Sequence, residues 1–345
     1  MNNKFFPSNF LFIMIMFTGT MFSLSSSHWL TMWMGLELNL MGFLPLMNIK
    51  GKMLEAEASM KYFIIQSMSS SILIISSVIM YNNNLSWYSM FSNNTIGIMI
   101  MLSLILKLGG APLHFWLPSI TKQMSWMILF LMLTWQKLAP LLMLSLMNSN
   151  LLILIMISIM STIMGSIMAL NQTNIQLIMT YSSISHLGWM LSMISINSSL
   201  TLIYFINYIM ISMPLMSLLS TSLGNHLFML THKNKTNNMI TISLILSLGG
   251  LPPLLGFMSK LIILISLIEM KMLMLTLFLF TGTLISLYFY LNMSLMLMIK
   301  SYMTLKTQKI NKMYNPVISL NMLSSFIMYP LIMMFIKYAM TIFYK

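Results

Sequence analysis

The sequence contains no cysteine, no arginine and no aspartate, and only four of its 345 residues are acidic. The absence of cysteine excludes disulfides, cysteine-ligated iron–sulfur clusters, thiolate zinc sites and cysteine nucleophiles. Charged residues make up 6% of the chain, whereas soluble domains contain about 25%. Such a chain has too few charged side chains to cover a surface exposed to water. With 58% hydrophobic residues, the composition predicts a polytopic membrane protein.

The net charge of +13 would suit a nucleic-acid-binding surface if the lysines formed one soluble face. They lie instead in short loops between apolar runs, so the charge does not indicate nucleic acid as a partner. Methionine accounts for 46 residues, which is more than packing requires and indicates a biased genetic system.

Long apolar runs occupy most of the chain. A helix that crosses a bilayer needs about 20 mostly apolar residues, and by that measure the chain holds about eleven such helices. We expect them at residues 8–25, 29–47, 61–80, 96–117, 126–147, 151–170, 177–196, 200–223, 239–268, 273–297 and 316–340. The connections are short and rich in Asn and Ser, so we expect a single all-α transmembrane domain over residues 1–345.

The lysines alternate between the two sides of this predicted topology. One side holds Lys4, Lys50, Lys52, Lys61, Lys122, Lys233, Lys235, Lys300, Lys306, Lys309 and Lys312. The opposite side holds Lys271, Lys337 and Lys345. Loops on the negative side of a membrane carry an excess of lysine. We therefore expect the N-terminus and the lysine-rich loops on that side, and the C-terminus on the other.

Two of the predicted helices are interrupted by the same motif, Leu-Gly-Gly-x-Pro. The interrupting residues are Gly109, Gly110 and Pro112 in the fourth helix, and Gly249, Gly250, Pro252 and Pro253 in the ninth. Matched interruptions five helices apart predict two inverted five-helix repeats, residues 8–147 and 151–297, followed by a C-terminal helix at 316–340. A packing kink at each motif is the alternative, because Gly and Pro are common in membrane helices.

Four ionisable residues fall inside predicted membrane helices, namely Glu37, Lys107, Lys137 and Lys260. A charge at the bilayer centre costs at least about 2.5–3.5 kcal/mol on insertion scales, so each of the four needs a reason. A row of such groups joined by water can pass protons, whereas a structural ion pair would also explain Glu37. His114 and His186 are candidates for the same relay, although a buried histidine is as often a packing residue.

Six segments carry a close resemblance to a known family. They read "HWLTMWMGLELNLMGFLPL", "EASMKYFIIQ", "LKLGGAPLHFWLP", "LTWQKLAPL", "YSSISHLGWM" and "LSLGGLPPLLGFMSK", and they lie between about Ser27 and Lys260. In these motifs the chain resembles the mitochondrially encoded subunit 2 family of animal NADH dehydrogenase, the antiporter-like membrane subunits of respiratory complex I. The methionine excess and the absence of Cys and Arg resemble the composition of proteins encoded by an invertebrate mitochondrial genome.

The resemblance implies a function for the buried charges. The family's key glutamate falls on Glu37, the lysine before its first broken segment on Lys107, its bridging lysine on Lys137 and the lysine after "GGLPP" on Lys260. One departure is that Gln176 and Leu177 stand where the family usually has a basic pair. The resemblance also implies eleven helices, which agrees with the count made from the apolar runs.

We therefore expect a proton-translocating subunit of NADH:ubiquinone oxidoreductase in the mitochondrial inner membrane, with its lysine-rich loops in the matrix and its C-terminus in the intermembrane space. No G-x-G-x-x-G follows a predicted strand, so NADH, FMN, iron–sulfur clusters and ubiquinone are expected in partner subunits, with no cofactor or metal in this chain. Other membrane-arm and accessory subunits and the lipid bilayer are the expected partners, without a soluble substrate. A free-standing cation/proton antiporter and a purely structural scaffold subunit are the alternatives.

Overall fold

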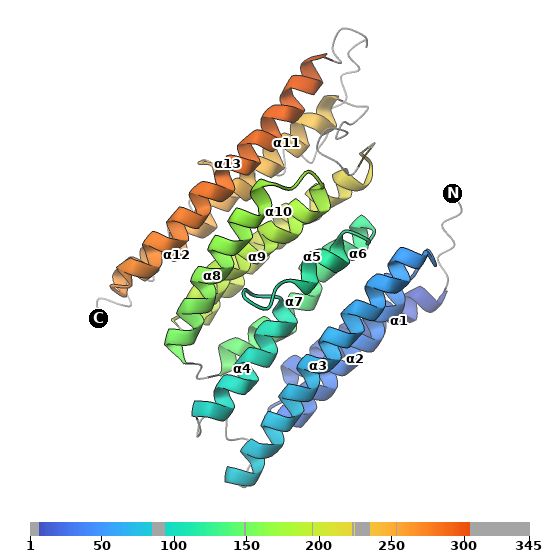
Figure 1. Ribbon diagram of the computed structural model, residues 1–345, viewed down its shortest axis with the longest axis vertical. Helices are drawn as coiled ribbons and strands as arrows, with labels where there is room; N and C mark the ends of the chain where they lie inside the picture. The colour runs from blue at the N-terminus through green and yellow to red at the C-terminus, as the bar shows by residue number, and fades with distance from the viewer. Residues whose placement is uncertain are drawn as a thin grey trace. The chain divides into compact units, whose positions relative to one another are not determined.

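The computed structural model describes residues 7–84, 94–147, 150–194, 196–222, 224, 235–252 and 254–303. Over these residues the chain folds into helices joined by short connections (Figure 1). Seven of these helical segments are long and apolar enough to cross a membrane. An all-helical chain is the expected outcome, because a helix satisfies its own backbone hydrogen bonds where no water is present.

Backbone contacts divide the chain into two compact units, and the first comprises residues 1–161 and 194–198. Its helices are α1 (Pro7–Ser25), α2 (Trp29–Met47), α3 (Met53–Asn84), α4 (Asn94–Leu108), α5 (Trp116–Thr121), α6 (Trp126–Leu133) and α7 (Trp135–Leu146), followed by the first half of α8 (Leu151–Leu170). Glycines let α1 and α2 approach closely. A Cβ on Gly19 would lie 2.6 Å from the backbone nitrogen of Asn39, and one on Gly42 would lie 2.7 Å from that of Met16. Small residues bring membrane helices together in this way.

The second unit comprises residues 162–193 and 199–345. It contains the rest of α8 together with α9 (Ile175–Ile194), α10 (Ser198–Ser220), α11 (Lys235–Gly249), α12 (Leu255–Glu269) and α13 (Leu273–Met303). Close approach again depends on glycine, because a Cβ on Gly165 of α8 would lie 2.8 Å from the backbone nitrogen of Ser185 on α9.

The predicted helices agree with those of the structure to within a few residues at most ends. The main difference is α3, which begins at Met53 rather than at residue 61, because the prediction followed only the apolar part of the helix. The prediction of one interrupted helix at 96–117 is replaced by α4, a turn at 109–115 and the short α5. The predicted C-terminal helix at 316–340 and Pro253 lie outside the described residues.

The two predicted interruptions have the same backbone cap. Gly109 has φ +72°, and its N–H and that of Gly110 both donate to the carbonyl of Ile105, at 2.9 and 3.2 Å. Gly250 has φ +81°, and its N–H and that of Leu251 both donate to the carbonyl of Leu246, at 3.1 and 3.3 Å. The N–H of each left-handed glycine also donates to the carbonyl three residues earlier, from Gly109 to Leu106 at 3.2 Å and from Gly250 to Ser247 at 3.1 Å. Together with the bond from the following residue, this bond makes a Schellman cap, which ends a helix.

The caps are offset by one residue in the shared motif. In the first interruption the first glycine of the Gly-Gly pair is left-handed, whereas in the second interruption it is the second glycine. As a result α4 ends at Leu108, before its glycine pair, and α11 ends at Gly249, within it.

A third interruption, not predicted from the sequence, separates α6 from α7 at Thr134. The backbone N–H and the hydroxyl of Thr134 both donate to the carbonyl of Phe130, at 3.0 and 2.7 Å. Pro140 in α7 has no N–H and so leaves the carbonyl of Gln136 without its usual helical donor. Lys137 lies between these two irregularities, at the start of α7.

Gly256, in the first turn of α12, is expected to be essential for assembly. A Cβ at this position would lie 1.7 Å from the carbonyl oxygen of Ser247 on α11, so the backbone of one helix would have to move. We expect Gly256→Ala to destabilise the protein by about 1–3 kcal/mol or more, measured as a lower thermal midpoint in detergent. Gly97 in α4 is the matched control, because a Cβ there meets nothing within 4 Å. An equal effect of Gly97→Ala would contradict the steric explanation.

Candidate functional site

The first unit brings Glu37 and Lys107 into electrostatic interaction. Glu37 lies on α2, and Lys107, which is 7% exposed, lies in the last turn of α4. The two charges interact through space, and the described residues contain no direct ion pair between them. The buried Oε1 of Glu37 has no hydrogen-bond partner among the described residues. The carboxylate can therefore accept a further hydrogen bond, from the lysine or from water.

Neutral side chains satisfy the carbonyls at the end of α4. The Nε1–H of Trp116 donates to the carbonyl of Leu106 at 3.2 Å, and the Nε2–H of Gln66 donates to the carbonyl of Lys107 at 3.5 Å. The last carbonyls of a helix have no intrahelical partner and need such donors. Trp116 and Gln66 supply these donors, so the carbonyls at the end of α4 do not need the ammonium of Lys107 as a hydrogen-bond donor.

An amide pair joins α2 to α7 beside Lys137. Asn39 Nδ2 donates to Gln136 Oε1 at 2.9 Å, and Gln136 Nε2 donates to Asn39 Oδ1 at 3.1 Å. The hydroxyl of Tyr62 on α3 adds a longer hydrogen bond to Gln136 Oε1, at 3.4 Å. Lys137, the next residue, is 3% exposed. The pair therefore links the helix that carries Glu37 to the helix that carries Lys137.

Lys260 occupies a different chemical setting in the second unit. Its Nζ donates to the carbonyls of Gly249 at 2.9 Å and of Leu248 at 3.4 Å, so the ammonium itself caps the end of α11. A positive charge is stabilised at a helix C-terminus, where the backbone dipoles place partial negative charge. Lys260 lies one turn after Gly256 on α12, and the close approach at Gly256 brings it within reach of these carbonyls.

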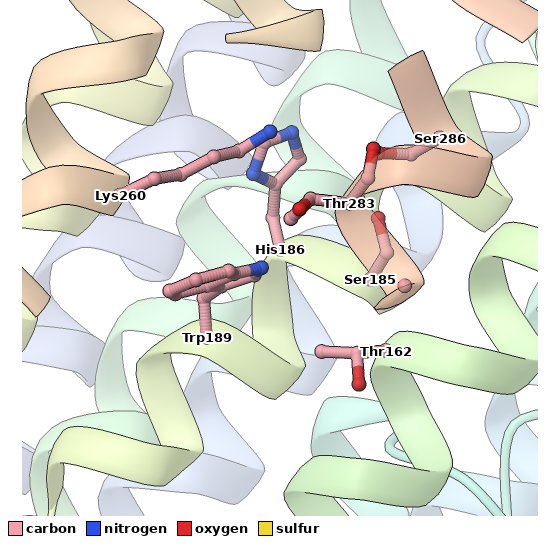
Figure 2. Close-up of a pocket in the computed structure, with 8 residues that line it drawn as sticks. Thr162, Ser185, His186, Trp189, Lys260, Thr283 and Ser286 are labelled. Carbon is pink, nitrogen blue, oxygen red and sulfur yellow. The ribbon is translucent and has the colours of Figure 1, made fainter. Parts of the chain in front are cut away.

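Lys260 and His186 line the same cavity, and Figure 2 shows the lysine side chain pointing toward the imidazole ring. His186 is on α9 and is 6% exposed. The other residues that line the cavity are Thr162, Ser185, Trp189, Gly282, Thr283 and Ser286. The hydroxyls in this lining can donate and accept hydrogen bonds, so the surroundings of Lys260 and His186 are suited to proton transfer.

The remaining predicted residues mark the turns at the interruptions. His114 lies in the turn between α4 and α5, where it is 1% exposed and its ring stacks on that of Phe115 with centroids 4.4 Å apart. It belongs to the first unit, whereas His186 and Lys260 belong to the second. Pro112 and Pro252 are exposed beyond the ends of α4 and α11.

Several residues of the site were not predicted from the sequence. Gln66 contacts a residue 41 positions away, and Asn39 and Gln136 are 97 positions apart, whereas Trp116 contacts Leu106 ten positions away. No local pattern marks these contacts. All four do lie within the motifs that carry the family resemblance. Among the residues described, no cluster of three His, Asp or Glu side chains could hold a metal ion.

Comparison with known proteins now identifies the family. Residues 26–286 match the family described as NADH:quinone oxidoreductase/Mrp antiporter, transmembrane. The chain belongs to this family.

Curated relatives and a solved structure agree with this membership. The chain is 41% identical over 271 residues to NADH-ubiquinone oxidoreductase chain 2 of Anopheles gambiae, covering 76% of this chain and 78% of that one. It is 38% identical over 267 residues to the protein of the same name from Locusta migratoria, covering 76% and 77%. Its fold is similar to that of a chain of respiratory complex I from Thermus thermophilus, with a TM-score of 0.77 and 22% identity over 84% of this chain and 70% of that one.

We expect the two reciprocal hydrogen bonds between Asn39 and Gln136 to stabilise the folded protein. Asn39→Leu leaves the amide of Gln136 without its partner, which costs about 1–3 kcal/mol for a buried polar group. The double variant with Gln136→Met replaces both amides by apolar side chains and should recover part of that loss. The thermal midpoint of the purified protein measures both effects. If the double variant loses as much stability, relative to the wild type, as Asn39→Leu and Gln136→Met lose together when made singly, the pairing is contradicted.

Proposed function

We propose that the chain is a proton-translocating membrane-arm subunit of NADH:ubiquinone oxidoreductase and so acts in respiratory electron transport as one part of a translocase. Its curated relatives carry the name NADH-ubiquinone oxidoreductase chain 2. The observation that carries the proton-transfer role is that each unit holds a buried lysine at a capped helix interruption, Lys107 in the first and Lys260 in the second. Buried charges in membrane helices mark ion and proton pathways.

In the proposed mechanism, Glu37 controls the proton of Lys107. A carboxylate near the ammonium favours its charged form, so movement of the carboxylate away makes the proton easier to release. Lys137 and Lys260 carry further steps, with His114 and His186 as possible members of the path. Moving one elementary charge against 100 mV costs about 2.3 kcal/mol, so the steps need an external source of free energy.

Quinone reduction in partner subunits supplies that free energy in this proposal. NADH, FMN, the iron–sulfur clusters and ubiquinone are bound by those partners, and this chain provides no redox centre. The absence of cysteine from the sequence supports this division, because thiolates are the ligands of most iron–sulfur clusters. The enzyme activity therefore belongs to the whole complex, and this chain contributes the proton path.

The proposed topology has eleven membrane helices, two inverted repeats at residues 8–147 and 151–297, and a C-terminal helix at 316–340. The matched Schellman caps at Gly109 and Gly250 support the repeat, because the same irregular backbone occurs once in each unit. The lysine alternation supports placing the N-terminus and the lysine-rich loops in the mitochondrial matrix, and the C-terminus in the intermembrane space.

The family includes Mrp antiporters, so a free-standing cation/proton antiporter is the second candidate function. A native gel, which separates intact protein complexes by size, distinguishes a complex subunit from a free-standing antiporter. On a native gel of mildly solubilised mitochondrial membranes stained for NADH dehydrogenase activity, we expect this chain, located by mass spectrometry, in a large active band. A small inactive band of its own would contradict membership of the complex and would favour the antiporter.

Neutralising Lys107 tests the proton path. In intact complex reconstituted into liposomes, we expect Lys107→Met or Glu37→Gln to lower the number of protons moved per NADH oxidised, because the exchange between the two charges is lost. Lys61→Met is the matched control, since Lys61 is an exposed lysine that pairs with Glu57 on the same helix. An unchanged proton stoichiometry in assembled Lys107→Met complex would refute the relay. Normal coupling with poor assembly in all such variants would favour a structural scaffold.

A further inference from the structure

Two of the lysine-rich connections meet at the start of α3. The Nε2–H of Gln123, which follows α5, donates to Oε2 of Glu57 on α3 at 3.4 Å, although the two residues are 66 positions apart. Lys122 precedes this glutamine, and Lys50 and Lys52 lie in the turn that leads into α3. All three lysines are exposed. The hydrogen bond therefore gathers them in one region of the first unit, and we call these three residues the lysine cluster.

The acidic residues nearby leave the lysine cluster with a net positive charge. Glu55 is 3% exposed, and its Oε2 accepts a hydrogen bond from the backbone N–H of Lys50 at 3.2 Å. Glu57 forms an ion pair with Lys61, four residues further along α3. Among the described residues, no ion pair involves a lysine of the cluster. One buried carboxylate therefore stands against three exposed ammonium groups.

Backbone hydrogen bonds hold the turn that carries Lys50 and Lys52. Gly51 has φ +61°, and its N–H donates to the carbonyl of Asn48 at 3.2 Å. The N–H of Ala56 donates to the carbonyl of Lys52 at 3.0 Å, which ties the turn to α3. A turn that is ordered before a ligand arrives loses less conformational freedom when the ligand binds.

The length of α3 places the lysine cluster at the depth of lipid headgroups. The helix has 32 residues and is about 48 Å long at about 1.5 Å per residue, whereas the hydrocarbon core of a bilayer is about 30 Å thick. Every charged residue of α3 lies at or before Lys61, and the remainder of the helix is uncharged. The first turns of α3 therefore extend beyond the hydrocarbon, into the region that holds phosphate groups.

Exposed apolar side chains accompany the lysines. Met53 is 88% exposed, and Met60, Ile64 and Met68 are 60%, 52% and 57% exposed. Their spacing of seven, four and four residues puts all four on one face of α3. Segments that combine lysines with an apolar face bind at the boundary between headgroups and acyl chains. A soluble anion would contact the lysines and leave this apolar face uncovered, whereas a lipid covers both.

We propose that the lysine cluster and the apolar face of α3 form a binding site for an anionic phospholipid. The phosphate of the headgroup contacts the ammonium groups of Lys50, Lys52 and Lys122, and an acyl chain lies along Met60, Ile64 and Met68. The site goes beyond the proposed function, because no residue of the proton path takes part in it. In the proposed topology the lipid belongs to the leaflet on the matrix side.

A photoactivatable phosphatidylglycerol tests the site in the native assembly that contains this chain. The assembly is extracted in mild detergent, irradiated with the probe at low ionic strength, and the label on residues 48–68 is measured by mass spectrometry. We expect more label than from a phosphatidylcholine probe with the same acyl chains. Neutralising each lysine of the cluster to Gln should lower the labelling about fivefold, and added salt should lower it as well.

Two variants serve as controls. Lys271→Gln removes an exposed lysine from the turn between α12 and α13 in the second unit, and should leave the labelling of residues 48–68 unchanged. Replacing all three lysines of the cluster by Arg keeps their charge and should preserve the labelling. Preserved labelling in the Arg variant, with loss in the Gln variant, supports recognition of the anionic headgroup.

Three results would overturn the inference. Equal labelling by the two lipids, or unchanged labelling in the triple Gln variant, would show that the cluster does not recognise a negative headgroup. Displacement of the probe by inorganic phosphate as effectively as by unlabelled phosphatidylglycerol would assign the lysines to a soluble anion. Loss of another subunit from the triple Gln variant, with labelling retained, would identify the surface as a protein contact.

Discussion

Everything in this fold depends on satisfying backbone carbonyls where no water is available. A continuous membrane helix does so internally, but a broken helix leaves its last carbonyls without partners. The chain meets this requirement twice with the same Schellman geometry and with different donors. At the end of α4 the donors are Trp116 and Gln66, and at the end of α11 the donor is the ammonium of Lys260. Two buried lysines near similar breaks therefore have different partners. Lys107 interacts with a carboxylate, and Lys260 interacts with the negative end of a helix.

Close helix packing holds these groups in place. Where glycine replaces a larger side chain, two backbones meet, and the register between their helices is set. The contact at Gly256 brings the start of α12 against Ser247, and Lys260 follows one turn later at its carbonyl partners. In the first unit the contact of Gly19 with Asn39 sets the register of α2, which carries Glu37 and the amide pair with Gln136. Contacts between backbones therefore place the titratable side chains, although no titratable group takes part in these contacts.

The cavity that Lys260 and His186 line contains several hydroxyl groups, but in this conformation it leaves no room for a water molecule. A proton can cross such a gap only after side chains or helices move, or after water enters. That requirement suits a pump, because a permanently hydrated path would let protons leak back down the gradient. In the proposed function, quinone reduction in partner subunits would drive such a movement.

The sequence alone determined most of the helices, the four charged residues within them and the two glycine–proline interruptions. In hydrocarbon each helix satisfies its own backbone, so the length of an apolar run is enough to locate it. The tertiary structure decided which glycine of each pair takes the left-handed conformation, the interruption at Thr134, and the donors that cap α4 and α11. It also decided that Tyr204 rather than Tyr208 reaches His186. Some of these features depend on partners farther along the chain, since Gln66 is 41 residues from Lys107 and Tyr204 is 18 residues from His186. The others depend on local backbone conformation, which the types of the residues alone do not specify.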